Sequence, residues 1–224
     1  GLGSFEKIVG ETALAASGLA RTIDAVAMPG QQMFSSDAML GSTGKYTFQS
    51  YMRGRQYYYG LSLGAAYKIN PNLSAFAGVR GVYALCNYYG YVKDITVGQM
   101  PLYQMLDPTK TNSADIELNS DQTGIGFTPI LGVDYKLGRW NFAAKYEFKT
   151  RIRLKNKSVN QAPSIGNLPA NVVAALAKTG MPLEQATAVL TSPTVSATMM
   201  ALKTKFDTEL TEAIGEYEDG KKIA

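Results

Sequence analysis

The sequence contains no histidine and a single cysteine among its 224 residues. Without histidine the chain cannot build a Ser-His or Cys-His nucleophile pair, an H-E-x-x-H zinc site or any metal site with an imidazole ligand. Cys86 has apolar and aromatic neighbours rather than basic ones, so it is interpreted as a small buried or lipid-facing residue and not as a reactive thiolate. We therefore expect no catalytic residue, no metal site and no cofactor, and we expect that the protein is not an enzyme.

Long hydrophobic runs are also missing. No uninterrupted apolar stretch reaches the roughly 18 residues of a membrane-spanning helix, so the sequence predicts none. The mean hydropathy of −0.09 is typical of a water-soluble protein, but also of a membrane barrel, in which only one face of each strand meets lipid. The net charge of +4 is small and its cations are scattered among acids, which argues against nucleic acid as a partner.

The sequence does show strict alternation of apolar and polar residues. A period of two is typical of β-strands, and two such segments flank the short turn Asn70-Pro71-Asn72. We place this first hairpin at residues 57–91. The alternate apolar positions before and after the turn are Tyr59, Leu61, Leu63, Ala65, Tyr67 and Ile69, then Leu73, Ala75, Ala77, Val79, Gly81, Tyr83 and Leu85.

A second hairpin, at residues 124–155, repeats the design around a Gly138-Arg139 turn. Its apolar positions are Ile125, Phe127, Pro129, Leu131, Val133, Tyr135 and Leu137, then Trp140, Phe142, Ala144, Tyr146, Phe148, Thr150, Ile152 and Leu154. The opposite face of the returning strand carries five charged residues in a row, which are Lys145, Glu147, Lys149, Arg151 and Arg153.

These strands are longer than those of most globular proteins. They run for about 11 to 15 residues, where a globular strand has about 5 or 6 and a tilted membrane strand about 9 to 11. Aromatic residues lie beside the short turns and again at the far strand ends, as in the aromatic girdles of membrane barrels. The fold class expected is all-β, an antiparallel transmembrane β-barrel represented here by about four to five long strands, with helical extracellular loops and the short turns in the periplasm.

We treat residues 1–224 as a single partial barrel domain. Residues 1–45 are expected to be a helical loop or rim segment, 92–123 an extracellular loop and 156–215 a helical extracellular loop. Pro169 and Gly180 are typical of the first and last turns of a helix. A longer helical stripe follows, at Val195, Met199, Leu202, Phe206, Leu210 and Ile214.

Two groups of residues are candidates for function. Charged positions on the strands predict a wet lumen wall, whose basic excess either only solvates a channel or attracts an anionic solute: Arg80, Asp134, Lys145, Glu147, Lys149 and Arg151. Apolar and Met-rich positions in the helical segment predict a site for an apolar ligand, or else helix-to-helix packing: Leu176, Met181, Leu190, Met199, Leu202 and Phe206.

Two stretches resemble the long-chain fatty acid and aromatic hydrocarbon transporters of the outer membrane, the FadL and TodX-like family. They are YYYGLSLGAAYKINPNLSAFAGVRGVYA at 57–84 and GFTPILGVDYKLGRWNFAAKYEFKTRIRLKNKS at 126–158. The resemblance implies a barrel of about fourteen strands, an N-terminal hatch, a hydrophobic groove formed by the outer loops, and a sideways exit for the substrate. No hatch is identifiable and four strands cannot close a barrel, so we expect the chain to be part of a longer protein.

The function expected from these features is passive uptake of hydrophobic compounds, such as long-chain fatty acids or aromatic hydrocarbons, across the outer membrane of a Gram-negative bacterium. Its partners would be outer-membrane lipids and a hydrophobic small molecule. One alternative is a structural or adhesive outer-membrane protein whose loops bind a partner. Another is a soluble β-rich domain, in which helices would cover Tyr59, Leu61, Leu63, Phe142, Tyr146 and Phe148.

Overall fold

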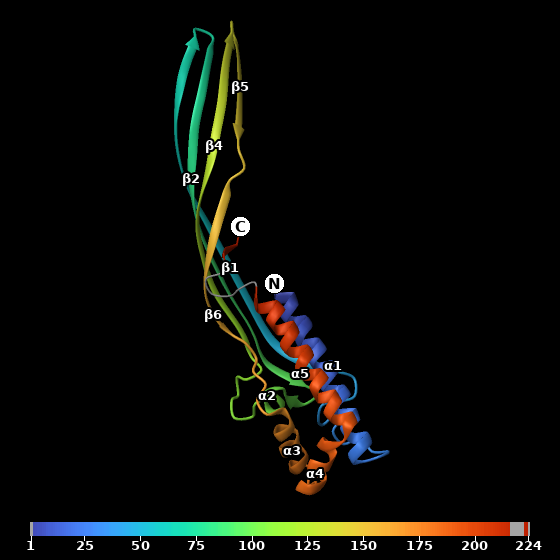
Figure 1. Cartoon of the computed structure of the whole chain (residues 1–224). Coiled ribbons are helices and arrows are strands. Elements are labelled where there is room, and N and C mark those ends of the chain that lie inside the picture. The colour runs from blue at the N-terminus through green and yellow to red at the C-terminus, as the bar shows by residue number, and fades with distance from the viewer. Residues whose placement is uncertain (1, 216–221, 224) are drawn as a thin grey trace. The chain divides into compact units, whose positions relative to one another are not determined.

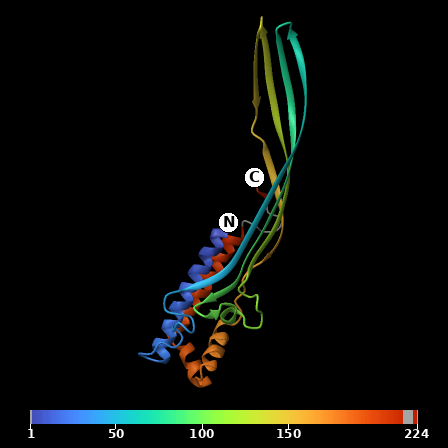
Figure 2. The ribbon, with the colours of Figure 1, turned by 180° about the vertical axis from the view of Figure 1, so that it is seen from behind.

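A computed structural model describes residues 2–215 and 222–223, with side chains for residues 3–213 (Figures 1 and 2). Ile214, the last position of the predicted helical stripe, lies outside the described side chains. The helices are α1 (Leu2–Ala27), α2 (Tyr103–Leu106), α3 (Leu168–Lys178), α4 (Leu183–Thr191) and α5 (Pro193–Gly215). The strands are β1 (Tyr46–Asn70), β2 (Leu73–Val97), β3 (Met100–Pro101), β4 (Ile116–Leu137), β5 (Trp140–Glu147), β6 (Arg151–Gln161) and β7 (Lys222–Ile223).

The prediction of an all-β protein is wrong, because helices make up 33% of the chain and strands 44%. The long helical segments bury their apolar stripes in a core of their own, so they are structural elements rather than decorations of loops. The strands form one antiparallel sheet in the order β1-β2-β4-β6-β7, with β3 paired to β2 and β5 paired to β4. No helix among the described residues is long and apolar enough to cross a membrane.

The chain divides into two compact units. Unit 1 consists of residues 1–53, 89–118 and 160–216, and unit 2 of residues 54–88, 119–159 and 217–224. Strands β1, β2, β4 and β6 each contribute residues to both units. Unit 1 therefore holds the five helices of the described residues, while the described part of unit 2 is built from strands.

The core of unit 1 is formed largely by α1 and α5, which lie side by side (Figure 1). In α1 the buried residues recur every three or four positions, as in Ile8, Leu19 and Ile23, and the small buried residues Ala13 and Ala16 let the neighbouring helix approach closely. Each fully buried Leu or Ile contributes about 1.5–3 kcal/mol. Strand residues of the same unit join this core, among them Val92, Val97 and Ile116.

Strands β2 and β4 extend into the segment 92–123, which was expected to be a loop. β2 continues to Val97 and β4 begins at Ile116, so that the connection contains only β3, α2 and turns. The polar residues near the start of β4 are held by pairing with neighbouring strands, which outweighs their weak β-propensity. Likewise, β6 continues to Gln161 before the helices of the 156–215 segment begin.

Unit 2 contains the two predicted hairpins and their turns. Asn70 closes the first turn, because its side-chain oxygen accepts hydrogen bonds from the backbone N–H groups of Asn72 at 2.9 Å and Leu73 at 2.8 Å. Gly138 opens the second turn with a φ of 58°, a left-handed value that glycine adopts without strain. The β4 and β5 strands then pair in register from Leu137 and Trp140 to Ile130 and Glu147.

A β-bulge separates β5 from β6. The N–H of Phe148 donates to the carbonyl of Pro129, and the hydroxyl of Thr150 bonds that of Thr128, so Lys149 has no counterpart on β4. Pro129 has no N–H to donate to the ladder, and a break in the partner strand at this point is the expected consequence. The predicted continuous strand from 140 to 154 is therefore two strands in different registers.

Candidate functional site

The sheet of unit 2 has two chemically different faces. The face that we call the apolar face carries alternate residues of each strand, and register places Leu131 opposite Tyr146 and Tyr135 opposite Phe142 on it. Its large side chains are Tyr59, Leu61, Leu63, Tyr67, Val79, Tyr83, Ile125, Phe127, Leu131, Val133, Tyr135, Trp140, Phe142 and Tyr146. The other face, which we call the glycine-rich face, carries Gly60, Gly64, Gly78, Gly126 and Gly132 together with Ser62, Phe76, Arg80, Thr128 and Glu147.

The large side chains of the apolar face are exposed. Tyr67 is 74% exposed, Leu61 71% and Trp140 70%. The glycine-rich face is shielded along β4, where Thr128 and Ile130 are 2% and 3% exposed, whereas the residues of β5 are exposed on both faces. No element of unit 2 packs over the large apolar side chains. A row of large apolar side chains left exposed is the reverse of what a protein folded in water shows, where such side chains are mostly shielded.

Glycines on the glycine-rich face make room for two large side chains. A Cβ at Gly64 would lie 2.4 Å from the Phe76 ring, and a Cβ at Gly78 would lie 2.9 Å from it, so the ring covers both glycines. The Arg80 side chain similarly lies against Gly60, with Cδ 3.3 Å from the position of a Cβ. An aromatic ring above a glycine is a known means of stabilising glycine within a strand.

Arg80 is the centre of an ion-pair cluster on this face. Its Nη1 and Nη2 donate to the two Glu147 carboxylate oxygens at 2.9 and 3.0 Å, and its Nε donates to Ser62 Oγ at 3.1 Å. Lys145 Nζ lies 2.5 Å from Glu147 Oε1. This bidentate arrangement ties β1, β2 and β5 together, while both side chains of the Arg80–Glu147 pair stay about one-third exposed.

The structure thus brings three of the predicted lumen residues together, which are Arg80, Lys145 and Glu147. Asp134 follows on the same face, because its register partner is Ala143 and its carboxylate accepts from Asn141 Nδ2 at 3.3 Å. Lys149 is the extra residue of the bulge.

The prediction that Arg151 shares the face of Glu147 is corrected by the same bulge. Ile152 turns toward the glycine-rich face, where a Cβ at Gly126 would meet its Cγ1 at 2.6 Å. Leu154 lies against Gly124 in the same way. The odd-numbered residues of β6 therefore point to the apolar face, and four of them form what we call the basic row: Arg151, Arg153, Lys155 and Lys157, all exposed.

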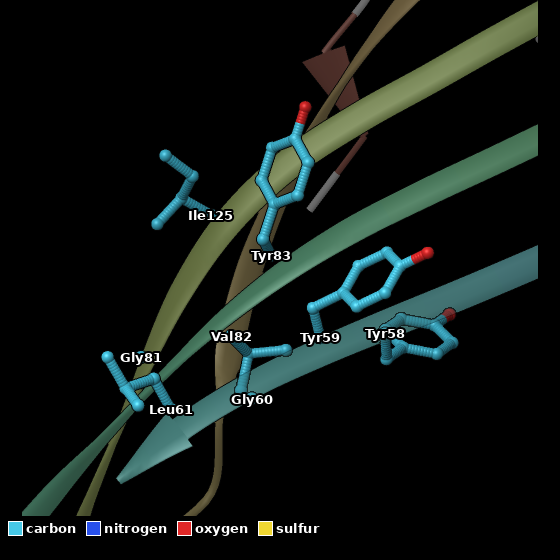
Figure 3. A pocket seen from close by; sticks show the side chains of 8 residues that line it. All are labelled: Tyr58, Tyr59, Gly60, Leu61, Gly81, Val82, Tyr83 and Ile125. Carbon is cyan, nitrogen blue, oxygen red and sulfur yellow. The ribbon is translucent and has the colours of Figure 1, made fainter. Parts of the chain in front are cut away.

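Two grooves lie on the apolar face. The first, the tyrosine groove, is an open depression of about 540 Å³ at Gly81, lined by Tyr59, Leu61, Tyr83 and Ile125 (Figure 3).

The second, the alanine groove, is an open depression of about 800 Å³ over four small residues. They are Ala65, Ala75, Ala77 and Ala144, and Tyr67 and Tyr146 also line the groove. Both volumes are in the range of small-molecule sites.

The residues predicted to bind an apolar ligand lie elsewhere, in unit 1. Five of the six are buried in its hydrophobic core, and the sixth, Leu190, packs against that core. The buried five are Leu176, Met181, Met199, Leu202 and Phe206. This placement agrees with the alternative that these residues pack the helices against one another. None of them lines the two grooves, so their role in ligand binding stays a prediction.

A cavity of about 370 Å³ in unit 1 was not anticipated from the sequence. It is lined by Asp94, whose φ of 53° is left-handed, and by Asp115. Burial raises the pKa of the Asp115 carboxyl, and the nearby charge of Asp94 adds to the effect. Among the side chains that the structure describes, no three cysteine or acidic groups cluster closely enough to hold a metal ion.

Comparison with known proteins leaves the family open. No protein-family model matches the sequence, and no curated protein sequence matches it.

Proposed function

We propose that this chain belongs to an outer-membrane protein in which the apolar face of unit 2 contacts lipid, and that the protein mediates passive uptake of hydrophobic compounds. The observation that carries the first part is the exposed apolar face itself, set against an opposite face of glycine, serine, arginine and glutamate whose polar groups are paired with one another.

The energetics favour a lipid environment for this face. Apolar surface costs about 25 cal/mol for each Å² left in water, and monomeric soluble proteins rarely expose contiguous apolar patches larger than a few hundred Å². Here exposed aromatic and aliphatic side chains follow one another along four paired segments. Lipid removes that cost, while the polar groups of the opposite face keep their own hydrogen bonds.

The aromatic residues support the same placement. Tyr67, Tyr135 and Trp140 lie near the two short turns, and Tyr57, Tyr58 and Tyr59 lie at the other end of the apolar stretch. Aromatic residues are enriched at both membrane interfaces, where an amphipathic ring is better placed than in water or in hydrocarbon.

A water-soluble sheet would need a cover over six side chains of unit 2, which are Tyr59, Leu61, Leu63, Phe142, Tyr146 and Phe148. Nothing within unit 2 supplies that cover, and the six are between 42% and 71% exposed. An adhesive role for the apolar helix stripe is disfavoured, because Val195, Met199, Leu202, Phe206 and Leu210 are buried rather than available to a partner.

Trp140 tests the lipid contact, since it is the single tryptophan of the chain. The full-length protein is reconstituted into vesicles containing lipids brominated on their acyl chains, and tryptophan fluorescence is recorded. We expect strong quenching relative to unbrominated vesicles. Fluorescence that is unchanged by bromine and quenched by aqueous acrylamide would contradict the proposal.

The solute class rests on the resemblance of residues 57–84 and 126–158 to transporters of long-chain fatty acids and aromatic hydrocarbons. Its test is uptake of a labelled long-chain fatty acid by cells that lack their own outer-membrane transporter and express the full-length protein. We expect uptake above that of cells with an empty vector. Equal uptake, with the protein demonstrably in the outer membrane, would contradict a transport role while leaving the lipid contact intact.

A further inference from the structure

We propose that the basic row and the tyrosine groove together bind an anionic glycolipid, with its two phosphates on the row and an acyl chain in the groove. The proposal rests on the lipid contact of the apolar face proposed above. It is carried by two further observations, which are the position of four cations in a row at one end of the apolar face and the groove beside them.

The basic row is a regular array. Arg151, Arg153, Lys155 and Lys157 occupy alternate positions of β6 and are all exposed. Alternate residues of a strand lie about 6.8 Å apart, so the four side chains start from points spread over roughly 20 Å. An array of this length suits a ligand with more than one phosphate, and arginine binds phosphate oxygens in bidentate fashion.

Few carboxylates compete for the row. Within the described part of unit 2 the acidic residues are Asp121, Asp134 and Glu147. Glu147 is engaged by Arg80 and Lys145 on the glycine-rich face, where Asp134 also lies. Asp121 lies on the apolar face at the end of the row, where its carboxylate accepts a hydrogen bond from Asn87 Nδ2 at 2.6 Å and keeps its charge. Four cations against this one carboxylate leave the row with an excess of positive charge.

The tyrosine groove lies beside this charge. The contacts of Gly124 with Leu154 and of Gly126 with Ile152 place Ile125 opposite Arg153 on the apolar face. Ile125 is also one wall of the groove, whose gap is left by Gly81. In Figure 3 the Tyr83 ring lies between Ile125 and the Tyr59 ring, and all three residues line the groove.

Depth along the sheet places the row at a membrane interface. From Ile125 to the turn, β4 spans about 13 residues, which is about 43 Å along the strand and about 30 Å across a bilayer at a tilt near 45°. Arg153, opposite Ile125, therefore lies one hydrocarbon thickness from the turn at Gly138. With the short turns in the periplasm, that interface is the outer one, where a lipid with phosphates on a sugar headgroup presents them.

The test uses the full-length protein in detergent and measures bound lipid by native mass spectrometry. The probes are bisphosphorylated lipid A, the same lipid lacking one phosphate, and phosphatidylglycerol. We expect the bisphosphorylated lipid to bind most tightly. R151Q/R153Q should weaken it by about fivefold for each cation, so about 25-fold in all, and should reduce the preference for the second phosphate. The matched control K136Q/R139Q, with both cations near the turn, should bind like the native protein.

The groove has its own variant and control. G81L fills the floor of the tyrosine groove, and we expect it to weaken all three lipids, whereas A144L fills the alanine groove and should not. An equal loss of lipid affinity in R151Q/R153Q and K136Q/R139Q, or equal affinity of the native protein for all three lipids, would overturn the proposal. Quenching of Trp140 by brominated lipid is measured on the same variants. It depends on neither the row nor the groove, so it separates a failure of glycolipid binding from a failure of the lipid contact itself.

Discussion

Single residues decide where the strands of unit 2 break and what each face carries. Pro129 cannot donate to its neighbour, Lys149 is left unpaired, and the next residues exchange faces. The predicted row of five charges therefore ends at Glu147 on the glycine-rich face, and the basic residues beyond it appear on the apolar face. Pro129 is visible in the sequence, and it is the signal that could have located this change.

Gly64 provides a test of packing at the residue scale. In G64A the added methyl would lie 2.4 Å from the Phe76 ring, so we expect a loss of about 1–3 kcal/mol in the free energy of unfolding. G132A is the matched control, because its nearest neighbour would be at 3.5 Å. Urea unfolding in detergent measures both variants. Because the Ala77 carbonyl oxygen would still lie 2.9 Å from the added methyl, G64A should remain destabilising in an F76A background, though by less than in the native protein. A G64A protein as stable as G132A would contradict this packing.

Asp24 provides a second test, in unit 1. Its carboxylate is buried and accepts hydrogen bonds from the N–H groups of Phe34 and Ser35, each at 2.8 Å, and from Ser35 Oγ at 2.7 Å. D24N replaces an acceptor oxygen by a donor, so we expect unfolding to become easier by about 1–3 kcal/mol. The same change at the exposed Asp37 should have little effect, and thermal unfolding of the two variants compares them. Equal midpoints would show that the carboxylate is not needed to hold this loop.

At the scale of elements, periodicity and end signals predicted the regular parts of the chain. A helix between Pro169 and Gly180 is confirmed, because α3 has Pro169 in its first turn and Gly180, with a φ of 90°, just beyond its end. Both predicted hairpin turns are present as well. The extensions of β2 to Val97 and of β4 back to Ile116 were not predictable, because pairing with neighbours rather than local composition forms them.

The α1–α5 contact should depend on pH through Glu11 and Glu209. The hydrogen bond with Glu11 raises the pKa of Glu209 above the ordinary 4.5, and the same bond lowers the pKa of Glu11, with help from Lys205 and Lys7. A raised carboxyl pKa stabilises the fold at low pH and loses that effect as pH rises through the folded pKa. A lowered one stabilises it above the unfolded pKa. The Glu11–Glu209 pair therefore stabilises the fold most at pH values between the two folded pKa values, where the two carboxyls share one proton.

E209Q should separate these contributions. It keeps a side-chain amide for Glu11 and removes the repelling charge, so we expect a higher unfolding midpoint than that of the native protein at pH 8 and a shrinking difference toward pH 4. E212Q, an exposed change one turn away on α5, serves as the control. Thermal unfolding across this pH range is the measurement. A difference that grows toward acid pH would have the wrong sign for this account.

At the scale of the whole molecule, the alternation predicted the two faces of unit 2 but not the balance of secondary structure. Residues such as Leu61 and Phe142 lie on the expected face because a period of two fixes the side on which each side chain emerges. The sequence predicts loops for the segments that hold the helical third of the chain, whereas α1 and α5 bury a continuous core in unit 1. Their stripes were visible, but which element would cover them depends on contacts between distant segments.

The central claim is that lipid contacts one face of the unit 2 sheet and not the other, and moving the single tryptophan tests it. W140F/F142W keeps the indole on the apolar face, whereas W140F/A143W puts it one residue away on the glycine-rich face, opposite Asp134. In vesicles with brominated acyl chains we expect strong quenching of the first variant and weak quenching of the second. Equal quenching of the two, or stronger quenching at position 143, would contradict the claim.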